Sequence, residues 1–88
     1  MSLLLANEVQ VTRTLTLPLD REVNISCRLN SKPIRTVILI EGLLCGKIGV
    51  GVAATLDRPR TKRQVTVRCM NLATEQRKLN AGTIVGVY

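Results

Sequence analysis

Polar and apolar residues alternate along most of the chain, which is the pattern of β-strands with one buried face. Between residues 8 and 17 the even positions are polar and the odd positions are apolar, with Arg13 as the exception. Residues 22–29 alternate without a fault. The segment between them, Pro18 to Arg21, is rich in turn-forming residues. We therefore predict two paired antiparallel strands, residues 9–17 and 22–29, joined by a turn.

Four further segments complete the pattern. Residues 36–41 are apolar on both faces, which predicts a strand that is covered on both sides or passes through an interface. Residues 48–56 alternate large apolar with small residues, and a face of small residues indicates close approach of another backbone. Residues 65–69 and 83–88 are predicted as strands, and residues 73–82 as a loop.

Turn signals at short intervals and the absence of a helical period predict an all-β fold, a small antiparallel β-sandwich or barrel of six to seven strands. The 88 residues are expected to form a single β domain, residues 1–88, with residues 1–7 as a flexible N-terminal segment or a remnant of cloning. A hydrophobic content of 45% excludes disorder, although only one residue is aromatic. The longest apolar run is far shorter than a transmembrane helix, so we expect a soluble protein without a membrane partner.

Catalytic chemistry has few candidates in this sequence. The chain has no His, and its six carboxylates lie mostly beside basic residues. Glu41 is the most notable carboxylate, yet we interpret it as a charged residue at the end of a strand. Gly49, Gly51 and Ala54 match G-x-G-x-x-A, but β-branched neighbours argue against the helix that a dinucleotide site needs. We expect no enzyme activity, no cofactor and no small-molecule substrate.

Three cysteines, Cys27, Cys45 and Cys69, lie far apart without the paired spacing of a zinc site. Reduced thiols that are buried as small hydrophobic side chains are the expected state. No metal site is predicted, and the location is expected to be intracellular, cytoplasmic or nuclear.

Basic residues outnumber acidic ones, with 13 Lys and Arg against 6 Asp and Glu and a formal net charge of +7. The densest basic cluster is Arg58, Arg60, Lys62 and Arg63. A solvated connector is the simpler interpretation, and contact with phosphate or nucleic acid is the alternative. Such contact is expected to be weak and sensitive to salt, because the chain lacks aromatic residues for base stacking.

Residues 65–86 contain the pattern V-x-V-x-x-x-N-L-x-x-E-x-x-x-L-x-x-G-T-x-V-G. This segment resembles the end of a small β domain of gypsy-type LTR retrotransposon polyproteins, between the aspartic protease and the reverse transcriptase. Residues 52–56 and 15–25 are similar to upstream parts of the same domain. The resemblance implies a retrotransposon-derived β domain, or a domesticated cellular derivative, and it brings no catalytic residue with it. The ending Ala81 to Gly86 is also similar to the β-clip fold of dUTPases, whose nucleotide-binding motifs are absent here.

These observations favour a non-enzymatic interaction or structural domain of retrotransposon-polyprotein origin, which associates with itself or with neighbouring polyprotein domains. A basic nucleic-acid-binding accessory module and a diverged dUTPase-like β-clip domain are the alternatives. Self-association is expected from the apolar strand at 36–41, the small face at 49–53 and an unpaired edge at the final strand. The candidate residues for it are Thr36, Ile38, Ile40, Gly49, Gly51, Val85 and Val87.

Overall fold

All regular elements in the described part of the chain are β-strands, which confirms the all-β prediction. The computed structural model describes residues 7–33, 36–43, 49–59 and 63–88. The strands are β1 (Glu8–Val11), β2 (Leu15–Leu17), β3 (Glu22–Leu29), β4 (Ile38–Gly42), β5 (Val50–Val52), β6 (Thr55–Asp57), β7 (Gln64–Asn71), β8 (Arg77–Leu79) and β9 (Ile84–Val87).

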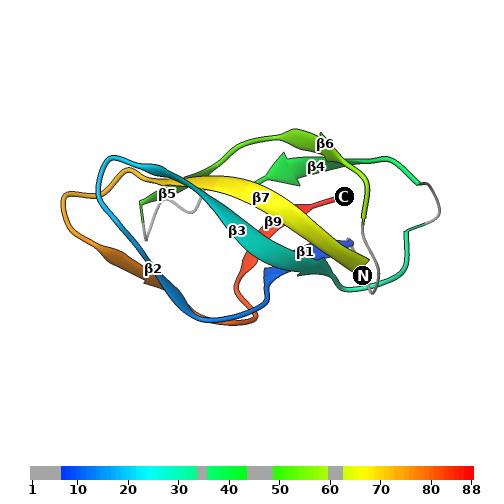
Figure 1. Cartoon of the computed structure of the whole chain (residues 1–88), viewed down its shortest axis with the longest axis horizontal. Coiled ribbons are helices and arrows are strands. Elements are labelled where there is room, and N and C mark those ends of the chain that lie inside the picture. The colour runs from blue at the N-terminus through cyan, green and yellow to red at the C-terminus, as the bar shows by residue number, and fades with distance from the viewer. Residues whose placement is uncertain (1–6, 34–35, 44–48, 60–62) are drawn as a thin grey trace, which may run out of the picture.

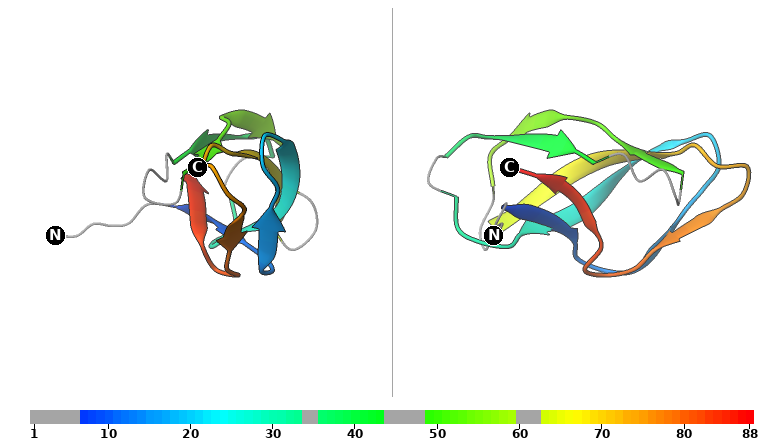
Figure 2. Two further views of the ribbon diagram at one scale, coloured as in Figure 1. Left: turned by 90° about the vertical axis from the view of Figure 1, so that its left-hand side faces the viewer. Right: turned by 180° about the vertical axis from the view of Figure 1, so that it is seen from behind.

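Seven strands form one antiparallel sheet in the order β5-β7-β3-β1-β9-β4-β6 (Figure 1). This sheet curls into a half-barrel, as the end-on view in Figure 2 shows, and β2 and β8 form a small second sheet. The end strands β5 and β6 follow each other directly in the chain, separated only by Ala53 and Ala54. Residues 50–57 therefore form both ends of the curled sheet, pairing with β7 in their first half and with β4 in their second.

The predicted strand at residues 9–17 is two strands that belong to different sheets. β1 pairs with β3 in the predicted antiparallel manner, from Val9 opposite Leu29 onward. Thr12 then uses both its backbone N–H and its hydroxyl on the carbonyl oxygen of Ser26, at 3.2 and 2.9 Å. Side-chain hydrogen bonds of this kind compete with the regular strand ladder, and the chain turns away from β3 here. The prediction that residues 15–17 pair with 22–29 is therefore wrong.

β2 instead pairs with β8, with Leu15 opposite Leu79. β8 lies inside residues 73–82, which the sequence predicted to be a loop. Three residues with the sequence Arg-Lys-Leu are too short and too polar to give an alternation signal. β8 is stabilised by its pairing with β2, and its register cannot be predicted from its own residues.

The Gly-rich segment is also broken, into β5 and β6. The predicted close approach of two backbones occurs at Gly42, where an added Cβ would collide with the carbonyl group of Val52. At Gly51 an added Cβ would meet a side chain instead, the Cδ1 of Leu72 at 3.2 Å. At Gly49, one of the predicted residues, an added Cβ would lie 3.3 Å from the backbone nitrogen of Ala73, so a close approach is also present there. The sequence did not single out Gly42, where the approach is closer.

The final strand is not an edge of the sheet, which corrects the prediction for residues 83–88. β9 lies between β1 and β4 and pairs with both. Val85 is fully buried as a result, and Val87 is half-buried. β4 shows one buried face only, since Ile38 and Ile40 point into the core.

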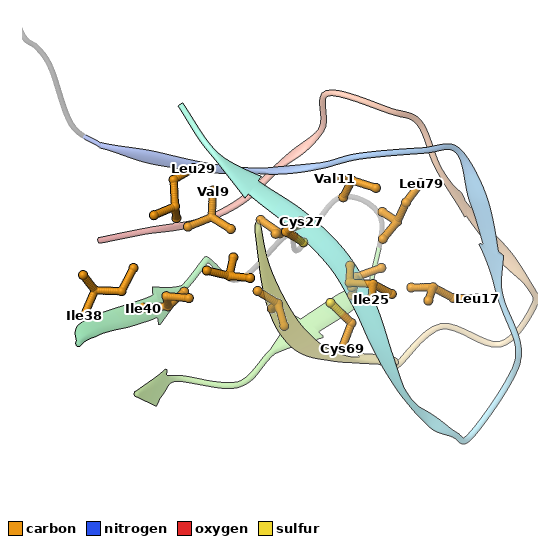
Figure 3. Close-up of a cluster of buried hydrophobic side chains, with 14 residues drawn as sticks. Val9, Val11, Leu17, Ile25, Cys27, Leu29, Ile38, Ile40, Cys69 and Leu79 are labelled. Atoms are coloured by element: carbon orange, nitrogen blue, oxygen red, sulfur yellow. The ribbon is translucent and has the colours of Figure 1, made fainter. Parts of the chain in front are cut away.

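The core runs along the inside of the half-barrel and is built from aliphatic and cysteine side chains (Figure 3). Leu29 and Ile38 lie toward one end of it, and Leu17 and Leu79 close the other. Its buried members are Val9, Val11, Leu17, Ile25, Cys27, Leu29, Ile38, Ile40, Val50, Val65, Val67, Cys69, Leu79 and Val85. The predicted inward faces of residues 22–29 and 65–69 are confirmed.

Candidate functional site

The strands β4 and β6 carry an apolar patch, which we define as Val37, Leu39 and Leu56, on the surface of the half-barrel. Leu39 and Leu56 are direct neighbours across the β4–β6 pair, and 50% and 70% of their surfaces are exposed. Val37, two positions before Leu39, is 40% exposed. Single exposed leucines are common on protein surfaces, whereas these three large apolar side chains line one groove.

The strand pattern explains why this patch faces solvent. Neighbouring residues on a strand point to opposite faces, so the burial of Ile38 and Ile40 turns Val37 and Leu39 outward. Leu56 also faces solvent, because it pairs with Leu39 and lies on the same face of the sheet. The sequence showed that this strand is apolar on both faces, and within the described residues the outer face is left without a covering element.

A shallow groove of about 710 Å³ runs beside the patch. All three patch residues line it, together with Pro33 and the aromatic ring residue Tyr88. Its polar rim includes a basic residue, Lys32, and the acidic Glu41. The rim therefore offers both signs of charge around an apolar floor.

Tyr88 is held at the groove by its hydroxyl group. The Oη atom donates to the carbonyl oxygen of Ser31 at 2.6 Å and accepts from the Ser31 backbone N–H at 3.2 Å. The backbone N–H of Tyr88 donates to the carbonyl oxygen of Asn7 at 3.0 Å. These bonds join the end of β9 to the turn after β3 and to the residue before β1, and they fix one wall of the groove.

The predicted self-association residues separate into two groups in the structure. Ile38, Ile40 and Val85 are core residues and are unable to offer their side chains to a partner. The remaining four are at least partly accessible: Thr36 is exposed, and Gly49, Gly51 and Val87 are half-buried. None of them belongs to the apolar patch. The sequence showed that residues 36–41 are apolar on both faces but could not say which of the two faces would be left uncovered.

The predicted basic cluster is placed only in part. Arg58 is exposed, and its backbone N–H donates to the Asp57 carboxylate at 2.8 Å. Arg63 is half-buried, and its guanidinium donates to the carbonyl oxygen of Asn30 at 3.2 Å. Arg60 and Lys62 lie outside the described residues. Arg63 therefore holds the turn after β3 in addition to contributing charge.

The other chemical candidates also have clear positions. Glu41 is exposed at the groove rim, and no group of three or more His, Cys, Asp or Glu that could hold a metal occurs among the residues the structure describes. Gly49 precedes β5, Gly51 lies within it and β6 follows, so this motif lacks the helix of a dinucleotide site. The described ranges contain no helix that could cross a membrane.

The cysteines are core residues where they are described. Cys27 and Cys69 are buried as predicted, and Cys45 lies outside the described residues. Burial raises the pKa of the Cys27 thiol to about 12, and the nearby Cys69 adds a smaller effect in the same direction. Such a thiol is a poor nucleophile at neutral pH, which suits a packing role.

Comparisons with protein-family models, with curated protein sequences and with solved structures gave no match for this chain.

Proposed function

We propose that this chain is a non-enzymatic protein interaction domain that associates with a second copy of itself through the apolar patch. The observation that carries the proposal is the solvent-exposed Leu39–Leu56 pair, extended by Val37. Apolar side chains on a sheet face gain free energy when they leave water, and a symmetric partner is the commonest way for a small protein to cover them.

The charges around the groove favour a second copy over an unrelated partner. In a twofold interface the same surface is used by both copies, so each residue must be complementary to another on that surface. Lys32 and Glu41 both line the groove and carry opposite charges, so Lys32 of one copy can face Glu41 of the other. Arg58 flanks Val37 and Leu56. Arg58 of one copy would repel Arg58 of the other, so the twofold axis should lie nearer to Leu39 than to Arg58.

The size of the patch sets the strength of the association. Completing the burial of one half-exposed Val or Leu contributes about 1 kcal/mol, and two copies bring six such side chains. The resulting gain of about 6 kcal/mol is close to the lower estimates for the cost of bringing two molecules together. Because the two terms nearly cancel, we expect a weak, reversible dimer that forms only toward millimolar concentration, where a net gain of about 4 kcal/mol is sufficient.

The resemblance to the β domain of gypsy-type polyproteins supports an origin of this domain in a retrotransposon. In that setting a weak dimer would bring two polyprotein chains together, and a neighbouring domain of the polyprotein is the alternative occupant of the patch. Asn71, the asparagine of the resembling pattern, is buried and makes three hydrogen bonds. A structural role for this residue agrees with a domain that has no catalytic group to preserve.

Sedimentation equilibrium of the wild type and of the double variant Leu39→Ser/Leu56→Ser tests this proposal. We expect the average mass of the wild type to rise above 9.7 kDa between about 50 μM and 2 mM, and the variant to stay at 9.7 kDa. Leu72→Ser is the matched control, because Leu72 is 59% exposed but lies outside the groove. A wild type that remains a monomer over the whole range contradicts self-association.

A further inference from the structure

The outer face of β3 and β7 differs in chemistry from the apolar patch. We define this β3–β7 face by its exposed side chains, Glu22, Asn24, Ser26, Arg28, Gln64, Thr66 and Arg68. None of them is apolar; two are arginines, and Glu22 is the acidic member. β3 and β7 are the longest strands of the sheet, and they pair over seven residues, so the face is an extended ribbon.

The strand register brings distant basic residues together on this face. Arg28 lies opposite Gln64. Arg63, which precedes Gln64, is half-buried and donates to the carbonyl oxygen of Asn30, so it is not counted with this face. Arg68 lies on the same face, opposite Asn24. Arg28 and Arg68 are therefore offset by four residues, which is about 13 Å along the strands.

Acidic groups near this face are few and already occupied. Glu22 lies 3.9 Å from Arg68 in an exposed ion pair, with both side chains about 60% accessible. Exposed pairs of this kind are weak and easily exchanged for another anion. The carboxylate of Asp57 accepts from the backbone N–H groups of Arg58 and Thr66, at 2.8 and 3.2 Å. The side chains that remain free to meet a ligand are hydrogen-bond donors and positive charges.

We infer that the β3–β7 face binds the phosphodiester backbone of a nucleic-acid duplex without reading its sequence. Arg28 and Arg68 would neutralise phosphates, while Ser26, Thr66 and the amides would donate hydrogen bonds to phosphate and sugar oxygens. Arg together with Ser, Thr, Asn and Gln is the set of side chains that proteins use for the nucleic-acid backbone. The net charge of +7 would raise the rate of encounter.

A duplex fits this face better than a single strand. Sequence-independent binding of single strands relies on aromatic side chains on which bases stack. Tyr88 is the only aromatic residue of the chain, and its hydroxyl is held in the turn after β3, at the groove beside the apolar patch. This second function does not depend on the proposed dimer, because its residues lie outside that groove.

Fluorescence anisotropy with a labelled 20-base-pair DNA of random sequence tests the inference in a salt titration from 20 to 200 mM. Two phosphate contacts predict a slope of log K against log salt of about −1.8. The variant Arg28→Gln/Arg68→Gln should bring this slope close to zero and weaken binding at 20 mM salt by at least about tenfold. Circular dichroism confirms that the variant is folded.

The matched control is Arg13→Gln/Lys78→Gln, which removes the same charge outside the β3–β7 face. It should keep a slope near that of the wild type. No binding at 20 mM salt, or an equal loss in both double variants, overturns the inference. Competition by poly-glutamate as strong as that by unlabelled duplex also overturns it, since the face would then recognise an acidic protein. Tighter binding of a 20-nucleotide single strand contradicts the assignment to a duplex.

Discussion

The side-chain amide nitrogen of Asn71, at the end of β7, donates a 3.1 Å hydrogen bond to the carbonyl oxygen of Leu17 on β2. The same nitrogen donates to the carbonyl oxygen of Glu75 at 3.0 Å, and Oδ1 accepts from the Ala73 backbone N–H at 2.9 Å. Asn71 is fully buried, so these bonds satisfy the amide away from water. This one side chain ties the small β2–β8 sheet to the half-barrel.

Replacement of Asn71 should therefore cost more than most substitutions in this protein. Asn71→Ala removes three hydrogen bonds and leaves the buried carbonyl oxygen of Leu17 without this donor, so we expect a loss of about 3 kcal/mol of unfolding free energy. Asn71→Asp should be at least as destabilising, because it places a carboxylate oxygen against carbonyl oxygens. Urea denaturation measures both. Asn24→Ala, on the exposed face of β3, is the control and should change the midpoint little.

Substitution of Gly42 tests whether the fold depends on the close approach of β4 to β5. An added Cβ would collide with the carbonyl group of Val52, so the approach of β4 to β5 requires the absence of a side chain. We expect Gly42→Ala to destabilise the fold by about 2–3 kcal/mol in urea denaturation. Gly82→Ala is a useful comparison, since the space around Gly82 is open and only its φ of 89° opposes a side chain. An effect of Gly42→Ala no larger than that of Gly82→Ala would contradict this account.

The buried Cys27 thiol predicts a loss of stability at alkaline pH. Its pKa is raised from 9.0 to about 12 in the folded chain, because burial disfavours the thiolate. Above pH 9 the unfolded chain releases this proton while the folded chain keeps it, so rising pH favours unfolding until about pH 12. The contribution is at most about 1.4 kcal/mol per pH unit.

Urea denaturation at pH 8 and at pH 10.5 measures this effect in the wild type and in Cys27→Ala. All other ionisable groups are the same in both proteins, so the difference between the two losses reports the Cys27 thiol. We expect the wild type to lose more stability than Cys27→Ala over this interval, even though the variant starts from a lower value. Parallel losses in the two proteins would show that the thiol does not resist ionisation.

Much of the sheet could be predicted from the sequence, because a strand with one buried face repeats every two residues. This alternation predicted β3 and β7, together with the inward positions of Ile25, Cys27, Val67 and Cys69. It also gave the antiparallel pairing of β1 with β3, since a short turn segment can reverse the chain. The all-β class follows from these local patterns alone.

The candidate surfaces depended on contacts between residues that are far apart in the chain. Residues 36–41 are apolar on both faces, and only the packed fold decides that Ile40 is buried while Leu39 is exposed. Leu56 joins Leu39 because β6 pairs with β4. Arg28 and Arg68 share a face because β3 pairs with β7 in one particular register. Neither partner strand carries a signal for this in its own residues.

The sequence by itself determined the class of the fold and the inward face of each long strand, because alternation is a local property of the chain. Tertiary structure decided where strands break, which edges are covered and which apolar face stays exposed. The strand at residues 9–17 divides because Thr12 bonds to Ser26 on a neighbouring strand. β9 is central because it pairs with both β1 and β4. Hydrogen bonds and burial between distant segments set these features, and an alternating pattern carries no information about its partner.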